Sequence, residues 1–367
     1  MPAVSDARDY DRAALATALL HLRSMTQQPI VLNGRAAVRP RVSGVERWGR
    51  EVIPRLRTLA PSRYLTLAPS PKIRGAAAGQ AWEQLALPAA AARAGASLIF
   101  SPANLAPMIW PRNVVVLHDA AVLREAGSYS PAYRIWHGSF GLACARRAVR
   151  VVTVSEFSRR ELSERTGIDD DRISVVYGGV DGRFRPDADR ERAAQRLGLE
   201  KPYVLTVATD DPRKNLSALA LAAQRLTGIG AELVWAGARR AHFERGDAVE
   251  GVRALGYVGE EDLPGLYAGA EAFVLPSRYE GFGLTCLEAM ACGTAVVASN
   301  RGGIPEACGD AALLVDPDDP EAIADALVRS LTDDQLRARV RDAGLRRAAE
   351  ITWDRTAERL NALLTAL

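Results

Sequence analysis

Short apolar segments recur along this chain in two successive series, with helical patterns between many of them. The first series occupies residues 30–33, 97–100, 114–117 and 151–154. The second begins at residues 203–208 and continues at 233–236, 252–255, 272–275 and 295–298. Apolar runs of this length are typical of parallel strands buried on both faces, and strands that alternate with helices build parallel sheets. The sequence therefore predicts an α/β protein with parallel sheets.

Two such series predict two Rossmann-like domains. The length of 367 residues and the apolar fraction of 48% are enough for two hydrophobic cores. The joint between the domains is expected at residues 180–186. Residues 1–28 have the pattern of an amphipathic helix ahead of the first strand, and we assign no chemistry to it.

Glu280 and Glu288 bracket a Gly-Phe-Gly turn between the strand that ends near residue 277 and a helix expected from Leu284, stopped by Gly293. A glycine turn that opens a helix can bind an anion, because free N–H groups and the helix dipole favour negative charge. Carboxylates beside a phosphate indicate a second task, such as binding sugar or ribose hydroxyls. The pattern predicts a nucleotide-sugar site; the alternative is two solvated acids near a helix start.

Arg213 and Lys214 follow the strand at 203–208, at the end of a strand where open α/β sheets bind ligands. Lysine is rare in this chain, with only Lys72, Lys201 and Lys214 among 47 basic residues. An arginine fork suits one face of a phosphate, and a lysine supplies a point charge for the other oxygens. The pair is predicted to bind phosphate; the alternative is a basic surface loop.

The Glu280 to Glu288 spacing resembles the E-x7-E signature of retaining glycosyltransferases with the GT-B fold, specifically family four. Residues 293–299 and 302–306 continue the same pattern. The resemblance implies two Rossmann-like domains that face each other across a cleft. It implies an acceptor-binding domain at 1–182, a nucleotide-sugar-binding domain at 183–350, and a helix at 351–367 that crosses back to the first domain.

The resemblance also implies roles for individual residues. Arg213 and Lys214 would hold the donor diphosphate, Glu280 would contact the donor sugar, and Glu288 would bind the ribose. The turn after the first strand, with Gly44, would approach the donor phosphate, and the segment with Val258 would border the base. The implied donor-binding set is Gly44, Arg213, Lys214, Val258, Glu280, Gly281, Phe282, Gly283, Leu284 and Glu288.

His118 and Asp119 follow the strand at 114–117, again at a carboxyl end that faces the expected cleft. They resemble the His-Asp position of the family, near donor sugar and acceptor. A neutral imidazole can bond a sugar hydroxyl, and Asp119 is a candidate acceptor base. The alternatives are a histidine satisfied by backbone and an aspartate that caps the following turn. Ser155 resembles a family element that caps a helix beside the cleft. The predicted catalytic set is His118, Asp119, Arg213, Lys214 and Glu280.

Charge is unevenly distributed along the chain. Residues 1–150 hold 20 Lys+Arg against 8 Asp+Glu, and the remainder holds 27 against 36. A basic half can bind nucleic acid, anionic lipid or an anionic substrate. No nucleic-acid-binding motif accompanies it, so we expect a lipid-diphosphate acceptor or an anionic membrane surface as partner, with scattered solvated arginines as the alternative.

Other features bear on location. The sequence contains no apolar stretch of eighteen residues and no signal-peptide pattern, which predicts a cytoplasmic protein. The basic N-terminal domain adds the expectation of peripheral contact with the inner face of the plasma membrane. The four cysteines form no C-x-x-C pair and are expected to be small buried hydrophobes.

Metal-dependent and dinucleotide enzymes are the first rivals. The sequences Asp169-Asp170-Asp171 and Asp9-Tyr10-Asp11 match the D-x-D motif with which GT-A enzymes bind a metal ion. The first of them, however, is expected in a solvated turn between a helix and a strand. We expect no metal and no cofactor, since Arg213, Lys214 and the turn amides can neutralise a diphosphate. An NAD enzyme is disfavoured because no G-x-G-x-x-G follows the first strand.

The resemblance further implies retaining front-face substitution, with electrostatic stabilisation of the leaving group. Residues 101–107 and 118–122 are similar to bacterial mannosyl- and rhamnosyltransferases of envelope polysaccharide assembly. We therefore expect a GDP-sugar donor, mannose or a related hexose, and a glycan or lipid-linked saccharide acceptor. A UDP-sugar donor, a GT-B epimerase or phosphorylase, and a non-catalytic sugar-binding protein remain as alternatives.

Overall fold

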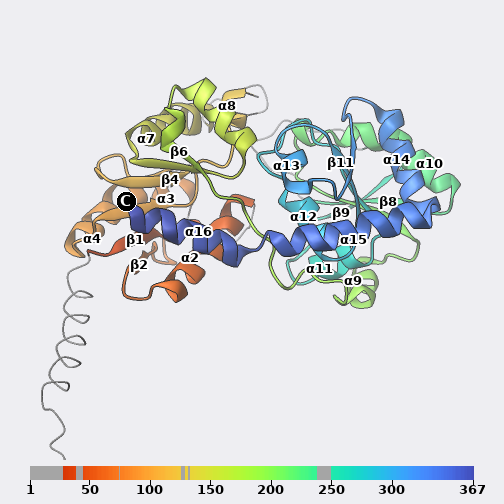
Figure 1. The fold of residues 1–367 in the computed structure, drawn as a ribbon, viewed down its shortest axis with the longest axis horizontal. Helices are drawn as coiled ribbons and strands as arrows, with labels where there is room; N and C mark the ends of the chain where they lie inside the picture. Colours follow the sequence, from red (N-terminus) through yellow and green to blue (C-terminus); the bar gives the residue numbers. More distant parts are fainter. Residues whose placement is uncertain (1–27, 39–43, 74, 125–128, 131–132, 238–248) are drawn as a thin grey trace, which may run out of the picture.

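The structure is a computed structural model that describes residues 28–38, 44–73, 75–124, 129–130, 133–237 and 249–367. It has two lobes, each built around one six-stranded sheet (Figure 1). The two predicted parallel sheets are thereby confirmed. The amphipathic helix expected at residues 1–28 and the Asp9-Tyr10-Asp11 sequence fall outside the described residues, apart from Gln28.

All strand pairs of the first sheet are parallel, in the order β2-β1-β3-β4-β5-β6. Its strands are β1 (Ile30–Asn33), β2 (Tyr64–Leu67), β3 (Leu98–Ser101), β4 (Asn113–Val116), β5 (Arg150–Thr153) and β6 (Ile173–Val175). The predicted strands agree with β1, β3, β4 and β5 to within one residue. The edge strand β2 was not predicted, because only Tyr64 in it is fully buried and the segment lacks a continuous apolar run.

The second sheet is also parallel, in the order β12-β11-β10-β7-β8-β9. Its strands are β7 (Tyr203–Val207), β8 (Glu232–Ala236), β9 (Val252–Gly256), β10 (Ala272–Leu275), β11 (Ala295–Ser299) and β12 (Leu313–Val315). Alternate residues of β7 belong to separate apolar clusters, Val204 to one and Leu205 to the other, so both faces of the sheet are covered. The edge strand β12 was not predicted because it has only three residues.

Both sheets reverse their strand order at one point. In the second sheet the chain runs from β7 outward to β9 and returns to β10 on the other side of β7. In the first sheet β2 and β3 flank β1 in the same way. The carboxyl ends of the strands at such a switch point open into a crevice where open α/β sheets bind their ligands. The fold therefore offers one crevice in each lobe.

Helices surround the two sheets. The first lobe contains α2 (Gly44–Leu59), α3 (Ala76–Ala81), η1 (Trp82–Ala86), α4 (Leu87–Arg93), α5 (Ala121–Arg124), η3 (Arg134–Phe140), α7 (Gly141–Arg147), α8 (Glu156–Thr166) and η4 (Asp170–Arg172). The rest of the chain contains α9 (Arg190–Leu197), η5 (Pro212–Lys214), η6 (Leu216–Leu219), α10 (Ala220–Gly228), α11 (Leu263–Ala268), α12 (Leu284–Ala291), α13 (Ile304–Cys308), α14 (Pro320–Thr332), α15 (Asp334–Glu350) and α16 (Trp353–Ala366).

The turn after β7 does not lead directly into an α-helix. Two short 3-10 turns come first, and the α-helix α10 begins only at Ala220. Asn215 interrupts the helix with a positive φ of 55°, a conformation that asparagine tolerates better than most residues. Its side-chain amide donates to the carbonyls of Pro276 (3.1 Å) and Pro317 (2.6 Å), which fixes the turn against the end of β10.

Within the described residues the chain crosses between the lobes twice, and the two crossings run side by side. Val180 in the first crossing forms a parallel bridge with Thr352 in the second, and the Val180 N–H donates to the Ile351 carbonyl at 3.0 Å. Gly179 permits this approach, because a Cβ there would lie 2.2 Å from the Thr352 carbonyl carbon. After the crossing, α16 leaves α15 and packs on α2 of the first lobe (Figure 1).

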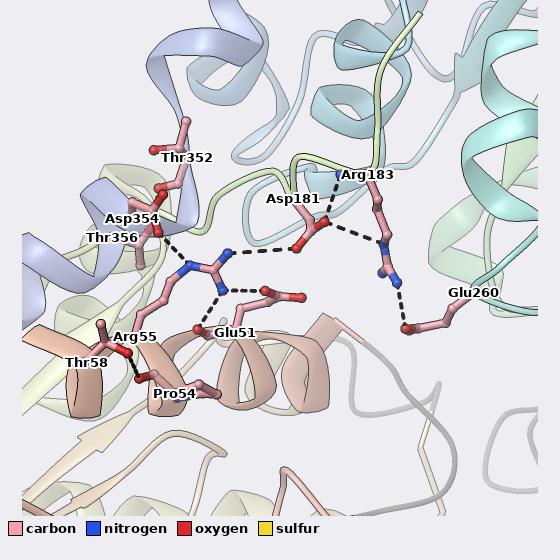
Figure 2. Close-up of polar contacts among 10 residues, drawn as sticks. All are labelled: Glu51, Pro54, Arg55, Thr58, Asp181, Arg183, Glu260, Thr352, Asp354 and Thr356. Atoms are coloured by element: carbon pink, nitrogen blue, oxygen red, sulfur yellow. Dashed lines mark hydrogen bonds and ion pairs between the residues drawn. The ribbon is translucent and has the colours of Figure 1, made fainter. Parts of the chain in front are cut away.

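Arg55 of α2 joins both crossings to the first lobe (Figure 2). Its Nε donates to Asp354 of α16 at 2.8 Å, and its Nη1 donates to the Glu51 carboxylate at 2.6 Å. Its Nη2 lies 3.8 Å from Asp181 of the linker. Burial and the nearby Asp181 raise the pKa of Glu51 above its ordinary value, against the opposing effect of Arg55. The guanidinium therefore holds together acidic groups from three segments that would otherwise repel one another.

Among the helices of the described residues, none combines the length and apolar character needed to cross a bilayer.

Candidate active site

A cavity of about 1600 Å³ lies between the lobes, and residues of both lobes line it. Its volume exceeds that of a typical small-molecule pocket, so two substrates can be held together. Every residue of the predicted catalytic and donor-binding sets lines this cavity. They are Gly44, His118, Asp119, Arg213, Lys214, Val258, Glu280, Gly281, Phe282, Gly283, Leu284 and Glu288. The structure thus brings together residues that span 245 positions of the chain.

The switch point of the second sheet explains why Arg213, Lys214 and Glu280 meet. β7 and β10 are neighbours in the sheet, and the two turns that follow their carboxyl ends lie side by side. The Arg278 N–H donates to the Arg213 carbonyl at 2.8 Å, which ties one turn to the other. The positions therefore follow from strand order rather than from sequence proximity.

Lys214 forms an ion pair with Glu280. The same carboxylate oxygen of Glu280 accepts a hydrogen bond from Ser277 Oγ at 3.1 Å. Both charged side chains retain 16% exposure and face the cavity. This arrangement presents an ammonium group for an anionic ligand and a carboxylate for hydroxyl groups.

Arg213 is held by the residue that opens its own turn. Asp211 is buried and accepts from the Arg213 backbone N–H at 3.0 Å and from its Nη2 at 2.6 Å. The guanidinium also lies over the rings of Tyr129 and Tyr279. Burial alone would lower the pKa of Arg213, but the carboxylates of Asp119 and Asp211 outweigh burial and raise it. The group stays charged and fixed in direction.

The glycine turn joins the lobes at the start of α12. Gly283 has a φ of 120°, which a side chain would strain, and it directly precedes α12. Gly281 faces the other lobe, because a Cβ on it would lie 2.5 Å from the carbonyl oxygen of His118. The Gly281 carbonyl accepts from Ser155 Oγ at 2.5 Å and from Ser158 Oγ at 3.1 Å. The turn is therefore pinned between both domains.

Ser155 caps α8 as expected, accepting from the Ser158 N–H at 2.9 Å. The Glu306 carboxylate reaches across from α13 and accepts from the backbone N–H groups of Glu156 (2.8 Å) and Phe157 (3.2 Å). An acidic side chain from one lobe thus completes the helix N-terminus of the other, where the helix dipole favours negative charge.

Glu288 lies inside the protein, with 3% exposure, so the alternative of a solvated surface acid is wrong for this residue. Tyr267 donates its hydroxyl to one carboxylate oxygen at 3.0 Å, and Arg47 of α2 pairs with the other. Burial, then the charge of Glu288, raise the pKa of Tyr267 well above its ordinary value, so the phenol remains a donor.

His118 is half-buried at the end of β4, edge-on to Trp48. Its Nε2 lies 2.9 Å from the Pro102 carbonyl, which can only accept, so the proton resides on Nε2 and Nδ1 is an acceptor. Burial lowers the pKa of His118, against smaller raising effects of the Pro102 bond and Asp119. The neighbouring Asp119 accepts from the Ala121 N–H at 2.9 Å, which is the turn-capping alternative, while still lining the cavity.

Comparison with known proteins agrees with this geometry. The family described as "Glycosyltransferase Family 4" matches residues 21–184, and "Glycosyl transferases group 1" matches residues 187–347. The O-antigen chain mannosyltransferase B of Escherichia coli is 36% identical over 266 residues, 68% of this chain and 70% of that protein. The chain belongs to glycosyltransferase family four. It is an enzyme of the hexosyltransferase type.

Another relative matches a shorter stretch of the chain, and solved structures share its fold. The D-inositol 3-phosphate glycosyltransferase of Salinispora arenicola is 37% identical over 236 residues, 57% of this chain and 53% of that protein. The sucrose-phosphate synthase of Thermosynechococcus elongatus superposes with a TM-score of 0.70 at 22% identity, covering 93% of this chain and 99% of that one. Anabaena HepE, solved with UDP-glucose, gives 0.72 at 19% identity, covering 93% and 100%. These structures establish the GT-B fold.

Sequence reasoning did not assign four charged residues that line this glycosyltransferase's cavity, Arg35, Glu46, Arg47 and Glu260. Arg47 and Glu260 form an ion pair at 3.2 Å, and Arg35 pairs with the buried Glu83 at 3.1 Å. Arg47 lies three residues after Gly44, at the start of α2, which was the one available signal. Its partners lie more than 200 positions away on the other lobe, so no local pattern could identify them.

Among the described residues, no group of three or more histidine, cysteine, aspartate or glutamate side chains is arranged to hold a metal ion. The four cysteines are free and buried, as the sequence predicted. Asp170 and Asp171 form the short turn η4 before β6, and the Asp170 carboxylate pairs with Arg159 at the surface.

Proposed function

We propose that this glycosyltransferase transfers mannose or a related hexose from a GDP-sugar to a glycan or lipid-linked saccharide, in the synthesis of envelope polysaccharide. The observation that carries the proposal is the convergence of Arg213, Lys214, Glu280 and Glu288 on one cavity at the switch point of the second sheet. Two cations suit the diphosphate, and two carboxylates suit the hydroxyls of sugar and ribose. In this assignment Glu280 contacts the sugar and Glu288 the ribose.

Support for mannose comes from relatives named as mannosyltransferases, including the O-antigen enzyme of Escherichia coli. The HepE structure contains UDP-glucose, so a UDP-sugar is the competing donor. Val258 borders the second-lobe side of the cavity together with the half-exposed Tyr257, and we assign this segment to the nucleotide base. The donor base is therefore the first property to measure.

The proposed mechanism is front-face substitution with retention, without a metal. The bond between the anomeric carbon and the diphosphate oxygen breaks while the acceptor oxygen forms its bond on the same face. The acceptor hydroxyl loses its proton to the departing diphosphate oxygen. Arg213 and Lys214 stabilise the charge that develops on the diphosphate, helped by the amides of residues 281–284. His118 Nδ1 is a hydrogen-bond acceptor, so it can accept a hydrogen bond from a sugar hydroxyl near the reaction centre.

We assign the acceptor to the first lobe, residues 1–182, and the donor to residues 183–350, with residues 351–367 as the returning helix. The basic composition of residues 1–150 suits a lipid-diphosphate acceptor at an anionic membrane surface on the cytoplasmic side. Binding to vesicles with and without anionic lipid tests the membrane part of this assignment separately from catalysis.

The test of function begins with isothermal titration of GDP, UDP and ADP, with EDTA present. Hydrolysis of GDP-mannose and UDP-glucose is then followed by NMR, which reports the anomer released. The expected result is tightest binding of GDP and release of the α-anomer from GDP-α-mannose. Preference for UDP moves the donor assignment to a UDP-sugar, release of the inverted anomer overturns retention, and loss of activity in EDTA that added Mg²⁺ restores overturns metal independence. Failure to bind any nucleoside diphosphate overturns the proposal.

A further inference from the structure

Arg47 projects from the first turn of α2 across the cleft and contacts two carboxylates of the other lobe. Its Nη1 pairs with Glu288 of α12, and its Nη2 lies 3.2 Å from Glu260, which follows β9. The Arg47 side chain is 15% exposed. Burial alone would lower its pKa, but the two carboxylates outweigh burial and raise it, so the guanidinium is charged. One side chain thus connects the first lobe to the proposed ribose site.

The Glu288 carboxylate can accept more hydrogen bonds than these contacts use. Each carboxylate oxygen can accept about two hydrogen bonds. Arg47 uses one position on the first oxygen, and the Tyr267 hydroxyl uses one on the second, at 3.0 Å. One position remains on each oxygen, which matches the two adjacent hydroxyl groups of a ribose. Arg47 and a ribose can therefore bind Glu288 together, and Arg47 fixes the direction in which the free positions point.

The second contact of Arg47 is itself anchored at the hinge. Glu260 also accepts from Arg183 of the linker at 3.1 Å (Figure 2). Burial alone would raise the pKa of Glu260, but Arg47 and Arg183 together lower it. The guanidinium of Arg183 lies 5.1 Å from the centre of the Phe184 ring and that of Arg47 lies 6.0 Å from it, both within cation–π range. The carboxylate that holds Arg47 is thus fixed by the segment that joins the lobes.

We propose that Arg47 is a positioning residue of the donor site, which orients Glu288 toward the ribose hydroxyls of the nucleotide when the lobes are closed. The proposal rests on the proposed role of Glu288 as the ribose ligand. It follows from the geometry that a buried carboxylate needs a cationic partner, and Arg47 supplies it from the opposite lobe. Ribose recognition is therefore available only in the closed arrangement, which couples donor binding to domain closure.

A direct contact between Arg47 and the diphosphate is the competing explanation. Within the described part of the chain, Arg47 Nε is buried without a hydrogen-bond partner, and a phosphate oxygen could occupy it. The two explanations differ in which part of the nucleotide depends on Arg47 for its binding. A positioning role acts through the ribose hydroxyls, whereas a phosphate contact is indifferent to them.

The deciding experiment compares a nucleoside 5′-diphosphate with its 2′,3′-dideoxy form, using the base that the wild-type protein binds most tightly. Affinities are measured by titration calorimetry for the wild type, Arg47→Met and Arg57→Met. Arg57 is an exposed arginine on the same helix and serves as the matched control. We expect Arg47→Met to weaken binding of the ribose form at least about tenfold and to leave the dideoxy form within about twofold. Arg57→Met leaves both affinities unchanged.

Other outcomes are equally decisive. Equal losses for both nucleotides, or no loss for either, overturn the positioning role. A wild type that distinguishes the two nucleotides, with a discrimination that Arg47→Met does not alter, overturns the role of Arg47 while the proposed function stands. A wild type that binds no nucleoside diphosphate overturns the proposed function, and the inference with it.

If Arg47→Met does not fold, Arg47→Lys and Glu260→Gln take its place. A lysine cannot place two separate donors on two carboxylates, and Glu260→Gln weakens the second anchor of Arg47. Both are expected to reduce the discrimination between ribose and dideoxy forms by a smaller factor than Arg47→Met. Discrimination equal to that of the wild type in both variants overturns the inference.

Discussion

Lys214 and Glu280 form an ion pair between the turn that follows β7 and the turn that follows β10. The cation proposed for the diphosphate and the carboxylate proposed for the sugar are therefore direct partners. Ser277 donates to the same carboxylate at 3.1 Å, which gives Glu280 a second partner in its own turn. The pair holds both groups in position at the cavity wall.

Replacing Lys214 by alanine tests the electrostatic part of the mechanism. We expect turnover to fall about 100- to 1000-fold, the range found when one preorganised charge-stabilising group is removed. The melting temperature should change little, because the side chain lies at the edge of the cavity. The matched control is Lys201→Ala, which removes an exposed lysine two residues before β7. Steady-state kinetics and thermal melting of both variants decide; near-normal turnover with unchanged melting contradicts the proposed role.

The close approach of Gly281 to His118 makes a second prediction. A methyl group on Gly281 would lie 2.5 Å from the His118 carbonyl oxygen and 3.1 Å from the Cβ of Asp119. The first of these is a backbone atom, so the clash is relieved only by moving the lobes apart. Gly281→Ala should therefore reduce kcat/KM at least about tenfold, since misplacement by 1 Å alone can cost about 100-fold.

Small-angle scattering measures the separation of the lobes directly, and the radius of gyration of Gly281→Ala should exceed that of the wild type. Gly182→Ala is the control, because a Cβ at Gly182 meets no atom within 4 Å. An active Gly281→Ala variant with unchanged scattering would show that the lobes need not approach this closely.

The sequence was sufficient to predict the parts of the site that depend on strand ends. Arg213 and Lys214 follow one apolar run and Glu280 follows another, and residues at the carboxyl ends of parallel strands in one sheet face the same edge. The glycine turn and the buried strands were predictable for the same reason, since local composition determines them. The edge strand β2 was not predicted, because only Tyr64 in it is buried and the other side chains are partly or fully exposed to solvent.

Contacts between the lobes could not be predicted in this way. Arg47 acts on Glu288, 241 positions away, and Arg55 acts on Asp354, 299 positions away. In the sequence each is an ordinary arginine on an amphipathic helix. Their partners are set by how the lobes pack, which depends on the close crossing at Gly179 and on the return of α16 to α2. Such long-range geometry leaves no periodic trace in the chain.

Arg55 provides a third prediction, on stability. Its guanidinium separates the acidic groups of Glu51 and Asp181 and binds Asp354 (Figure 2). Arg55→Met keeps much of the side-chain volume but leaves these carboxylates to repel one another. We expect the free energy of unfolding to fall by about 1–3 kcal/mol, within the usual range for breaking a partly buried charge network.

Urea denaturation of Arg55→Met and Arg57→Met checks this expectation, because Arg57 is an exposed arginine of the same helix. The loss should be smaller in high salt, where repulsion between the freed carboxylates is screened. Equal stabilities for the two variants would mean that the contacts of Arg55 contribute nothing net to the fold.

The fourth prediction concerns the pH dependence contributed by His118. Burial lowers the folded-state pKa of this imidazole below its ordinary value of about 6.5. As the pH falls below that value, the unfolded chain takes up a proton on His118 while the folded protein does not, so the free energy of unfolding decreases. The stabilising contribution is complete above about pH 6.5 and is lost as the pH falls through the lowered pKa.

His118→Gln isolates this contribution. A glutamine amide can donate to the Pro102 carbonyl, as Nε2 does in the wild type, but it does not titrate. We therefore expect the difference in unfolding free energy between wild type and His118→Gln to shift against the wild type as the pH falls below about 6.5, and to be constant above it. Urea denaturation at intervals between pH 4 and 8 measures the difference, in which the titration of all other groups cancels. A difference independent of pH would mean that folding leaves the pKa of His118 unshifted, which contradicts the lowered pKa. A difference that favours the wild type at low pH would mean a raised pKa and a charged imidazole in the folded protein, and Nδ1 would then be a donor rather than an acceptor toward the sugar.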